Sequence, residues 1–536
     1  MKADTLVLGH IATLNDHEPF KEALACKDGR IIYVGSEETA RRICDAHTRV
    51  LNYRDAYVYP GFADAHCHGG AAAIFLQVAN LHEGHSIADY QAILKKYGDE
   101  HPDSEFIVGT GMSIGSDHPT HEVLDVVSSE RPILAQTGDG HSILLNRVAM
   151  EKLKIDKSFA QNSTPDLVCV DANGEPTGWM NEGPAMALYS KITAADIEFC
   201  KAGLLKWQKK AFSLGLTAVA DAFIAKDVLA AYTELVDEGM WHLRTYGAYN
   251  VARDADFVAE ADKIAKIAKE SRSEYFSILG AKMFLDGVIE QHTAWLSEPY
   301  ADQPDNIGSP LVTDKESVVA MIKRLERHGL NAHFHAIGDG AVHFALDCIE
   351  EAQIATGNMM QRNEIAHIQL ASPADVARMG DLNVVAIVAP LWMSKDPNYY
   401  DQTERYLGKR RTFFNYPFKS FLNHDAVLAF HSDFPVSQQL GTARSVYMAC
   451  RRCDPANDIY YQLNPSECLN RLEALSGLTY GPLFAFRQET RQGRCEAGYL
   501  ANLTVYDTDF FNDKIENVAA ANLLATIVDG NEVYTA

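Results

Sequence analysis

The chain has 536 residues, enough for one large α/β barrel or for about two to four smaller domains. It carries 48 Lys and Arg against 72 Asp and Glu, which gives a net charge of −24. Negative charge on this scale opposes binding to phosphate backbones and to anionic lipid surfaces. We therefore expect neither a nucleic-acid partner nor a membrane partner.

Cysteine spacing and hydropathy indicate in which cellular compartment the protein is expected. Among ten cysteines, the one Cys-x-x-Cys pair, Cys450 and Cys453, supplies too few thiolates for a structural zinc site. The first residues lack the apolar core of a secretory signal, and no run of about 18 apolar residues occurs. We expect a cytoplasmic protein with reduced cysteines and a small-molecule substrate, and a homo-oligomer is compatible with these features.

Both ends of the chain are rich in short β-like segments. Residues 5–8, 23–26 and 31–34 are apolar runs, and the last two are joined by the turn Asp28-Gly29. The end of the chain repeats this pattern at 503–506, 524–528 and 533–534, with the turn Asp529-Gly530. We therefore predict a small composite β-sandwich domain built from residues 1–58 and 485–536.

The middle of the chain, residues 59–484, alternates apolar runs with amphipathic stretches. The runs lie at 217–220, 244–249, 278–284, 332–335, 365–368, 384–389 and 427–430, and the amphipathic stretches include 257–270 and 315–327. This alternation predicts an α/β fold of the (β/α)8 TIM-barrel type. Residues from about 70 to 200 fit the repeat poorly, with turn-rich pieces at 109–111 and 171–174. We read them as an insertion after the first barrel strand.

The segment PGFADAHCHGG contains the strongest local signal. His66 and His68 are two residues apart, so in a strand their imidazoles point the same way and can bind one metal ion. Asp64 shares that face as an outer partner. The alternative is a pair of unconnected histidines near a turn.

Three later apolar runs also end in candidate ligands. His333 and His335 share a face in NAHFHAIGDGAV, His367 ends the run in NEIAHIQ, and Asp433 follows the run in VLAFHSDFPV. A buried carboxylate is unfavourable unless it is paired or binds a metal. The alternatives are a core histidine for His333, a structural role for His367 and a helix N-cap for Asp433.

Lys282 lies in the middle of the apolar run FSILGAKMFLDG. A buried lysine tends to lose its charge, and the neutral amine can react with CO2 to form a carbamate that bridges two metal ions. The alternative is an internal ion pair between Lys282 and Asp286. The ordered set of His, Lys and Asp suits one or two divalent ions, with zinc the best match.

With these motifs the sequence resembles the amidohydrolase superfamily, and within it the YtcJ-like (amidohydrolase 3) group that includes N-substituted formamide deformylases. The segments that carry the resemblance are EALACKDGRIIYVG, PGFADAHCH, DGHSILLN, GEPTGWMNE, KMFLDG, HAIGDGAV, EIAHIQ and SDFPV. The resemblance implies a metal site made of His66, His68, Lys282, His335, His367 and Asp433, with Lys282 as the carboxylated bridge if two ions are bound.

Two positions depart from the pattern of the family. His431 stands where Gly is more common before Ser-Asp, and it either marks a subgroup or adds a polar group near the metal. Asn502 replaces a usual Asp, and we expect it to affect only the terminal β domain.

The ligand set implies hydrolysis by a metal-activated water, with Asp433 as the proton carrier and His335 or His367 stabilising the oxyanion. We expect cleavage of a C–N bond in an amide, formamide or N-acyl compound. A deaminase or lactonase on the same centre and a non-catalytic metal-binding protein are the alternatives. Substrate-pocket candidates are Trp295, Trp392, Tyr399, Tyr400, His141 and Glu182, although the aromatic residues are also typical packing residues.

Overall fold

The computed structural model describes residues 2–14, 19–113, 118–138, 140, 142–163, 167–193, 197–393, 397–456 and 462–536. The chain divides into two compact units. One contains Met1–Gly69 and Gln208–Ala536, and the other contains Gly70–Trp207. None of the helices in the described part of the chain combines the length and the apolar character that a bilayer crossing requires.

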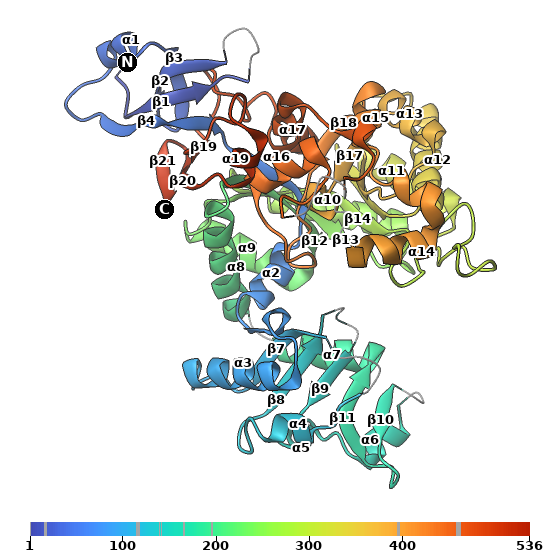
Figure 1. Cartoon of the computed structure of the whole chain (residues 1–536). Helices are drawn as coiled ribbons and strands as arrows, with labels where there is room; N and C mark the ends of the chain where they lie inside the picture. Colours follow the sequence, from blue (N-terminus) through green and yellow to red (C-terminus); the bar gives the residue numbers. More distant parts are fainter. Residues whose placement is uncertain are drawn as a thin grey trace. The chain divides into compact units, whose positions relative to one another are not determined.

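The larger unit contains an eight-stranded sheet in which every neighbouring pair is parallel (Figure 1). Its strands, in the order of the sheet, are β5 (Phe62–Cys67), β12 (Leu216–Ile224), β13 (Arg244–Asn250), β14 (Phe276–Phe284), β15 (Asn331–Ala336), β16 (Glu364–His367), β17 (Val385–Val388) and β18 (Val427–Phe430). The predicted α/β barrel is confirmed. Its strands are short apolar runs because a parallel sheet is covered on both faces.

Helices follow most of the barrel strands. They are α8 (Ile197–Phe212), α9 (Lys226–Asp237), α10 (Phe257–Glu270), α11 (Lys315–Arg327), α12 (Asp339–Thr356), α13 (Pro373–Asp381), α14 (Pro397–Phe413), α15 (Phe418–Asn423), α16 (Thr442–Arg451), α17 (Arg471–Leu478) and α18 (Tyr480–Ala485). Local sequence sets their starts. The carboxylate of Asp256 accepts hydrogen bonds from the backbone N–H groups of Val258 and Ala259 at the first turn of α10. The predicted helices 257–270 and 315–327 coincide with α10 and α11.

Small side chains fill the barrel interior next to a stacked aromatic pair. Ala63, Ala218 and Ala366 are fully buried there, and the ring of Phe486 stacks on Tyr246 with 4.6 Å between ring centroids. The barrel is therefore a packed core and not a pore, which leaves its carboxyl end for polar side chains.

The two chain ends pair in one seven-stranded sheet of the same unit. Its order is β21 (Asn531–Thr535), β20 (Leu523–Val528), β19 (Leu503–Tyr506), β4 (Arg49–Pro60), β1 (Thr5–Ala12), β2 (Phe20–Lys27) and β3 (Arg30–Gly35). Two short helices, α1 (Glu37–Arg42) and α19 (Ile515–Ala519), lie in the same regions of sequence. Strand β4 hydrogen-bonds to β1 on one side and to β19 on the other, which joins the two ends of the sequence.

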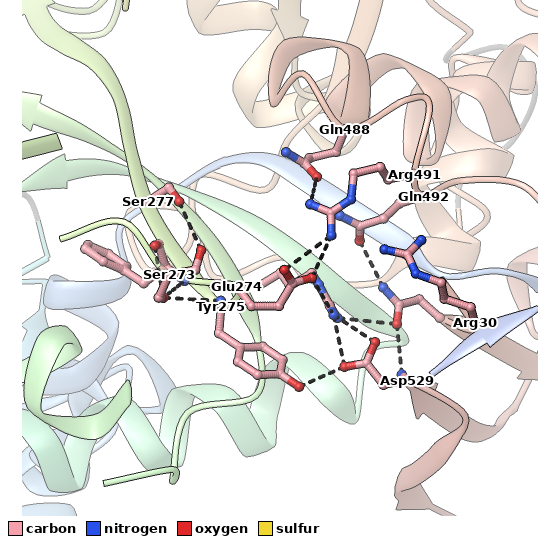
Figure 2. A network of polar contacts seen from close by, with 12 residues as sticks. Arg30, Ser273, Glu274, Tyr275, Ser277, Gln488, Arg491, Gln492 and Asp529 are labelled. Atoms are coloured by element: carbon pink, nitrogen blue, oxygen red, sulfur yellow. Dashed lines mark hydrogen bonds and ion pairs between the residues drawn. The ribbon is translucent and has the colours of Figure 1, made fainter. Parts of the chain in front are cut away.

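A buried polar network joins this terminal sheet to the barrel (Figure 2). Arg244, at the start of β13, donates to both carboxylate oxygens of Asp529 (2.8 and 2.9 Å), and the Tyr275 hydroxyl donates to the same carboxylate (2.8 Å). The side chain of Asn502 accepts from the Asp529 backbone N–H and donates to Gln492. Arg244 also reaches Asn502, at 3.4 Å. The expectation that Asn502 affects only the β domain is therefore wrong, because its amide group also contacts the barrel.

The second unit contains a six-stranded sheet of its own. The strands, in sheet order, are β10 (Val168–Val170), β11 (Pro176–Asn181), β9 (Ser142–Leu145), β8 (Ile133–Thr137), β7 (Ile107–Met112) and β6 (Ala79–Asn80). The helices between β5 and α8 are α2 (Gly69–Phe75), α3 (Ile87–Glu100), α4 (Glu122–Asp125), α5 (Arg147–Leu153), α6 (Lys157–Gln161) and α7 (Glu182–Thr193). Residues 109–111 were expected to form a turn and lie instead within strand β7. Residues 171–174 do form the turn between β10 and β11.

Candidate metal centre

Five barrel strands bring the candidate residues to one end of the barrel. His66 lies in β5 and His68 just after it, Lys282 in β14, His333 and His335 in β15, His367 at the end of β16, and His431 and Asp433 just after β18. All are buried except His68, whose side chain is 13% exposed. Because the strands are parallel, their carboxyl ends meet at the same end of the barrel.

Backbone hydrogen bonds join the first strand to the segment that follows the last one. The N–H of Asp433 donates to the carbonyl of His66 (3.0 Å), and the N–H of His68 donates to the carbonyl of Phe434 (2.8 Å). Asp433 has a φ of 59° and His367 a φ of 81°. Such left-handed backbone in non-glycine residues persists only where the surroundings hold it, and it is concentrated at functional sites.

The first group of residues that could bind a metal ion consists of His66, His68 and Asp433. The Oδ1 atom of Asp433 lies 3.0 Å from Nε2 of His68 and 3.3 Å from Nε2 of His66. Asp64 accepts from the backbone N–H groups of His66 and Ser432, both at 3.1 Å. Burial raises the pKa of Asp64 to about 6. Asp64 thus fixes the backbone on both sides of this group.

His333 connects His66 to a carboxylate that sequence reasoning missed. Its Nε2 lies 2.7 Å from Nδ1 of His66, and its Nδ1 lies 2.5 Å from Oε2 of Glu364. The carboxylate fixes the ring of His333, which in turn orients His66. A signal for Glu364 was present, since it is a carboxylate directly before the apolar residues of β16. Its partner depends on the register of β15 against β16 and could not be deduced.

His335 is oriented by Asp286 in the same way. The Asp286 carboxylate lies 3.1 Å from Nδ1 of His335 and accepts backbone N–H groups of Trp295, Ile337 and Gly338. The lone pair of Nε2 of His335 is then available to bind a metal ion. The alternative that Asp286 forms an ion pair with Lys282 is therefore wrong, because the carboxylate faces His335 and the start of α12.

Lys282 is fully buried, with Nζ 3.4 Å from Nε2 of His66 and 4.5 Å from the ring centroid of Phe284. Burial lowers the pKa of its amine to about 7, although the charges of Asp433 and Asp221 act in the opposite direction. A substantial fraction of the amine is therefore neutral near pH 7.

His367 and His431 form a second group with Asp433. One donor atom from each of the three lies within 4.8 Å of the other two. Nδ1 of His367 and both ring nitrogens of His431 are buried and have no hydrogen-bond partner in the described structure. Trp392 stacks on His367, with 5.2 Å between centroids and 13° between planes.

Burial keeps these imidazoles neutral. It lowers the pKa of His66 and of His367 well below the ordinary value and that of His431 to about 3. The pKa of Asp433 is lowered: burial raises it, but the hydrogen bond and charge of His68 and the charge of Lys282 outweigh that effect. Neutral imidazole and ionised carboxylate are the forms that bind metals.

Of the residues predicted to line a substrate pocket, the structure places one beside the histidine cluster. Trp392 contacts His367 as described, whereas Trp295 packs on Phe344, with 5.4 Å between centroids. His141 lies outside the described residues, and so do the side chains of Glu182, Tyr399 and Tyr400.

A parallel eight-stranded barrel with His, Lys and Asp side chains at its carboxyl end places this protein in the class of α/β barrels with a candidate metal site. Comparison with known families gives the finer assignment. The amidohydrolase family profile matches residues 49–534, so the chain belongs to the amidohydrolase family. The resemblance stated from the sequence motifs is confirmed.

Three relatives cover nearly the whole chain. Protein LONG AFTER FAR-RED 3 of Arabidopsis thaliana is 27% identical over 99% of this chain and 92% of its own length. Putative amidohydrolase YtcJ of Bacillus subtilis is 25% identical, covering 98% of each chain. The N-substituted formamide deformylase of Arthrobacter pascens is 22% identical over 98% of this chain and 97% of its own.

Two solved structures share the fold. An uncharacterized metal-dependent hydrolase from Pyrococcus furiosus superimposes with a TM-score of 0.77 at 24% identity, over 95% of this chain and 100% of that one. A similarly described protein from Pyrococcus horikoshii gives a TM-score of 0.79 at 23% identity, over 95% and 99%.

Proposed function

We propose that this protein hydrolyses the C–N bond of an amide, a formamide or another N-acyl small molecule and depends on a divalent cation. The observation that carries the proposal is the convergence of buried imidazole and carboxylate donors from five strands at one end of the barrel. The names of two relatives, a putative amidohydrolase and an N-substituted formamide deformylase, support the choice of bond.

The residues fit a divalent cation. Imidazole nitrogen with carboxylate oxygen is the ligand chemistry of zinc, and buried nitrogens without partners are unfavourable unless something binds them. We propose that one or two zinc ions are held by His66, His68, His335, His367 and Asp433. Oδ1 of Asp433 lies 3.3 Å from Nε2 of His66 and 3.0 Å from Nε2 of His68, so we propose that these three residues hold the first ion.

A bound ion of this kind lowers the pKa of a water molecule toward 7 and polarises a carbonyl group. Asp433 is ionised at neutral pH and can take the proton of the attacking water on its carboxylate, then return it to the leaving nitrogen. If only one ion is bound, whichever of His335 and His367 does not bind it can instead donate an N–H group to the carbonyl oxygen as negative charge develops there.

Lys282 can add a further anionic ligand. Its neutral amine attacks the carbon of CO2: an N–C bond forms, one C=O π bond of CO2 opens to give a negatively charged oxygen, and the nitrogen releases one proton to water, which leaves a carbamate. The pKa near 7 and the distance of 3.4 Å to His66 support this modification. We propose that the carbamate oxygens complete the centre when two ions are present.

The test combines metal content with turnover. Protein purified without chelator or added metal is assayed by elemental analysis and against formamides, N-acyl amines, lactones and aromatic amines. We expect bound zinc, hydrolysis of an N-acyl substrate, loss of that activity on chelation and recovery with zinc. Activity that survives complete metal removal contradicts the proposal. Turnover confined to aromatic amines or lactones would favour the deaminase or lactonase alternative, and absence of both metal and turnover would favour a non-catalytic role.

A further inference from the structure

His431 occupies the first position after β18 and lies inside the cluster of histidines. Its backbone N–H donates to the carbonyl of Val388 (2.9 Å), which continues the pairing of β18 with β17. Its ring centroid lies 5.0 Å from that of His367 and 5.2 Å from that of His66. The imidazole therefore faces the barrel end and not the surrounding helices.

Neither ring nitrogen of His431 has a hydrogen-bond partner among the described residues, although the side chain is buried. A neutral imidazole has one N–H donor and one lone-pair acceptor, and leaving both unsatisfied in a buried site is unfavourable. Nδ1 of His367 is in the same state on the adjacent ring. Because the two nitrogens of one imidazole point in different directions, one nitrogen of His431 can bind the same further group as one nitrogen of His367.

Asp433 supplies the oxygen that a cation needs at this place. Donor atoms of His367, His431 and Asp433 lie within 4.8 Å of one another. Trp392 fixes both rings, since it stacks on His367 and meets His431 edge-on at 5.4 Å and 79°. Two imidazoles and a carboxylate are a common set for zinc, and they leave one position open for water or substrate.

We propose that His431 is an additional ligand of the second divalent cation, which it binds together with His367 and with Asp433, the carboxylate shared with the position of His66 and His68. The proposal rests on the proposed function, since it adds a ligand to the same centre.

The test is zinc binding by the chelator-treated full-length chain, measured by calorimetric titration and by elemental analysis after dialysis. We expect two ions in the wild type. His431→Ala and His431→Phe should each retain one, with affinity for the other lowered at least about tenfold. The Phe variant keeps a ring against Trp392, and circular dichroism of both variants verifies folding. His328→Ala removes an exposed imidazole after α11 and should bind as the wild type does.

Cobalt gives a second readout that does not depend on turnover, because its visible absorption reports the ligands around the ion. His431→Phe should lose the bands of one cobalt ion, and His66→Ala should lose those of the other. Unchanged zinc stoichiometry and affinity in both His431 variants would overturn the role of His431 as a ligand. If His66→Ala also binds zinc as the wild type does, or if the wild type binds no ion, the proposed function itself is contradicted.

Discussion

Asp433 is the residue on which the centre depends most. Its carboxylate belongs to both donor groups, and its left-handed backbone is fixed by a hydrogen bond to His66. The carboxylate is ionised because His68 and Lys282 lower its pKa against the effect of burial. In the proposed function, this single side chain would contribute both metal binding and proton transfer.

We predict that Asp433→Ala lowers kcat by about 10²- to 10⁴-fold, the usual effect of removing a proton-transfer group. Steady-state kinetics on an N-acyl substrate measures the change, and far-ultraviolet circular dichroism should remain that of the wild type. Asp381→Ala, at the exposed end of α13, is the matched control and should leave kcat unchanged. Near-normal turnover in Asp433→Ala would contradict the role assigned to this carboxylate.

The buried histidines predict how the stability of the metal-free protein depends on pH. Burial lowers the pKa of His66, His367 and His431 below the unfolded value of about 6.5, and that of His431 to about 3. As the pH falls below about 6.5, the unfolded chain takes up protons that the folded chain does not. The free energy of unfolding should therefore decrease.

Urea denaturation of chelator-treated protein at about pH 7.5 and about pH 5 measures this effect. We expect a lower midpoint at the acidic pH and a smaller difference in His431→Phe, which lacks one of the titrating groups. Equal midpoints for the wild type at the two pH values would contradict the prediction.

Much of the candidate metal centre could be predicted residue by residue, because parallel strands bring their carboxyl ends together and residues two apart in a strand share a face. These two rules place His66, His68, His335, His367 and Asp433 near one another, and the resemblance to the amidohydrolase superfamily singled them out as a metal site. The contacts of Glu364 and Asp286 did not follow, since each depends on the register or loop geometry that places a carboxylate beside a particular imidazole.

At the scale of elements, Asp286 joins three parts of the chain. It follows β14, orients His335 in β15 and accepts backbone N–H groups at Trp295 and at the segment before α12. Its carboxylate is buried and satisfied by these donors. Removing the negative charge of Asp286 should therefore affect both the loop at Trp295 and the orientation of the His335 imidazole.

We predict that Asp286→Asn lowers the free energy of unfolding by about 1–3 kcal/mol and zinc affinity by about 10- to 100-fold. Urea denaturation and zinc titration measure the two effects. Asp302→Asn is the matched control, since Asp302 also pairs with a histidine, His292, but is 18% exposed. An equal effect of the two substitutions would mean that the contacts of Asp286 are not specific to the centre.

The strands and helices of the barrel were predictable because burial on both faces gives short apolar runs and outer helices are amphipathic. Gly109 shows where this reasoning fails. A Cβ atom at Gly109 would lie 2.9 Å from side-chain atoms of Leu81 and Leu94, so the glycine provides room for packing within β7. Composition alone does not distinguish such a glycine from one in a turn.

At the scale of the whole molecule, Arg244 and Asp529 connect the barrel to the sheet made by the chain ends. The guanidinium is almost fully buried and bonds both oxygens of the carboxylate. Breaking a buried pair leaves an uncompensated charge, which is more unfavourable than losing a contact at the surface.

We predict that Arg244→Ala lowers the free energy of unfolding by about 3–5 kcal/mol. Arg491→Ala removes a more exposed arginine of the same network, bonded to Glu274 at 3.0 Å, and should lower it by less than about 1 kcal/mol. Urea denaturation of both variants measures the difference. Equal losses would show that burial of the Arg244 pair does not determine its contribution.

The hydrogen bonds between the first barrel strand and the segment after the last one also affect when the centre can form during biosynthesis. His68 and Asp433 are 365 positions apart, and the carbonyl of Phe434 is needed to hold the backbone of His68. Until residue 433 has been translated, the nascent polypeptide presents His66 and His68 without the carboxylate of Asp433. Translation runs from the N-terminus, so this centre is assembled late, and any cation that requires Asp433 is loaded after most of the polypeptide has been made.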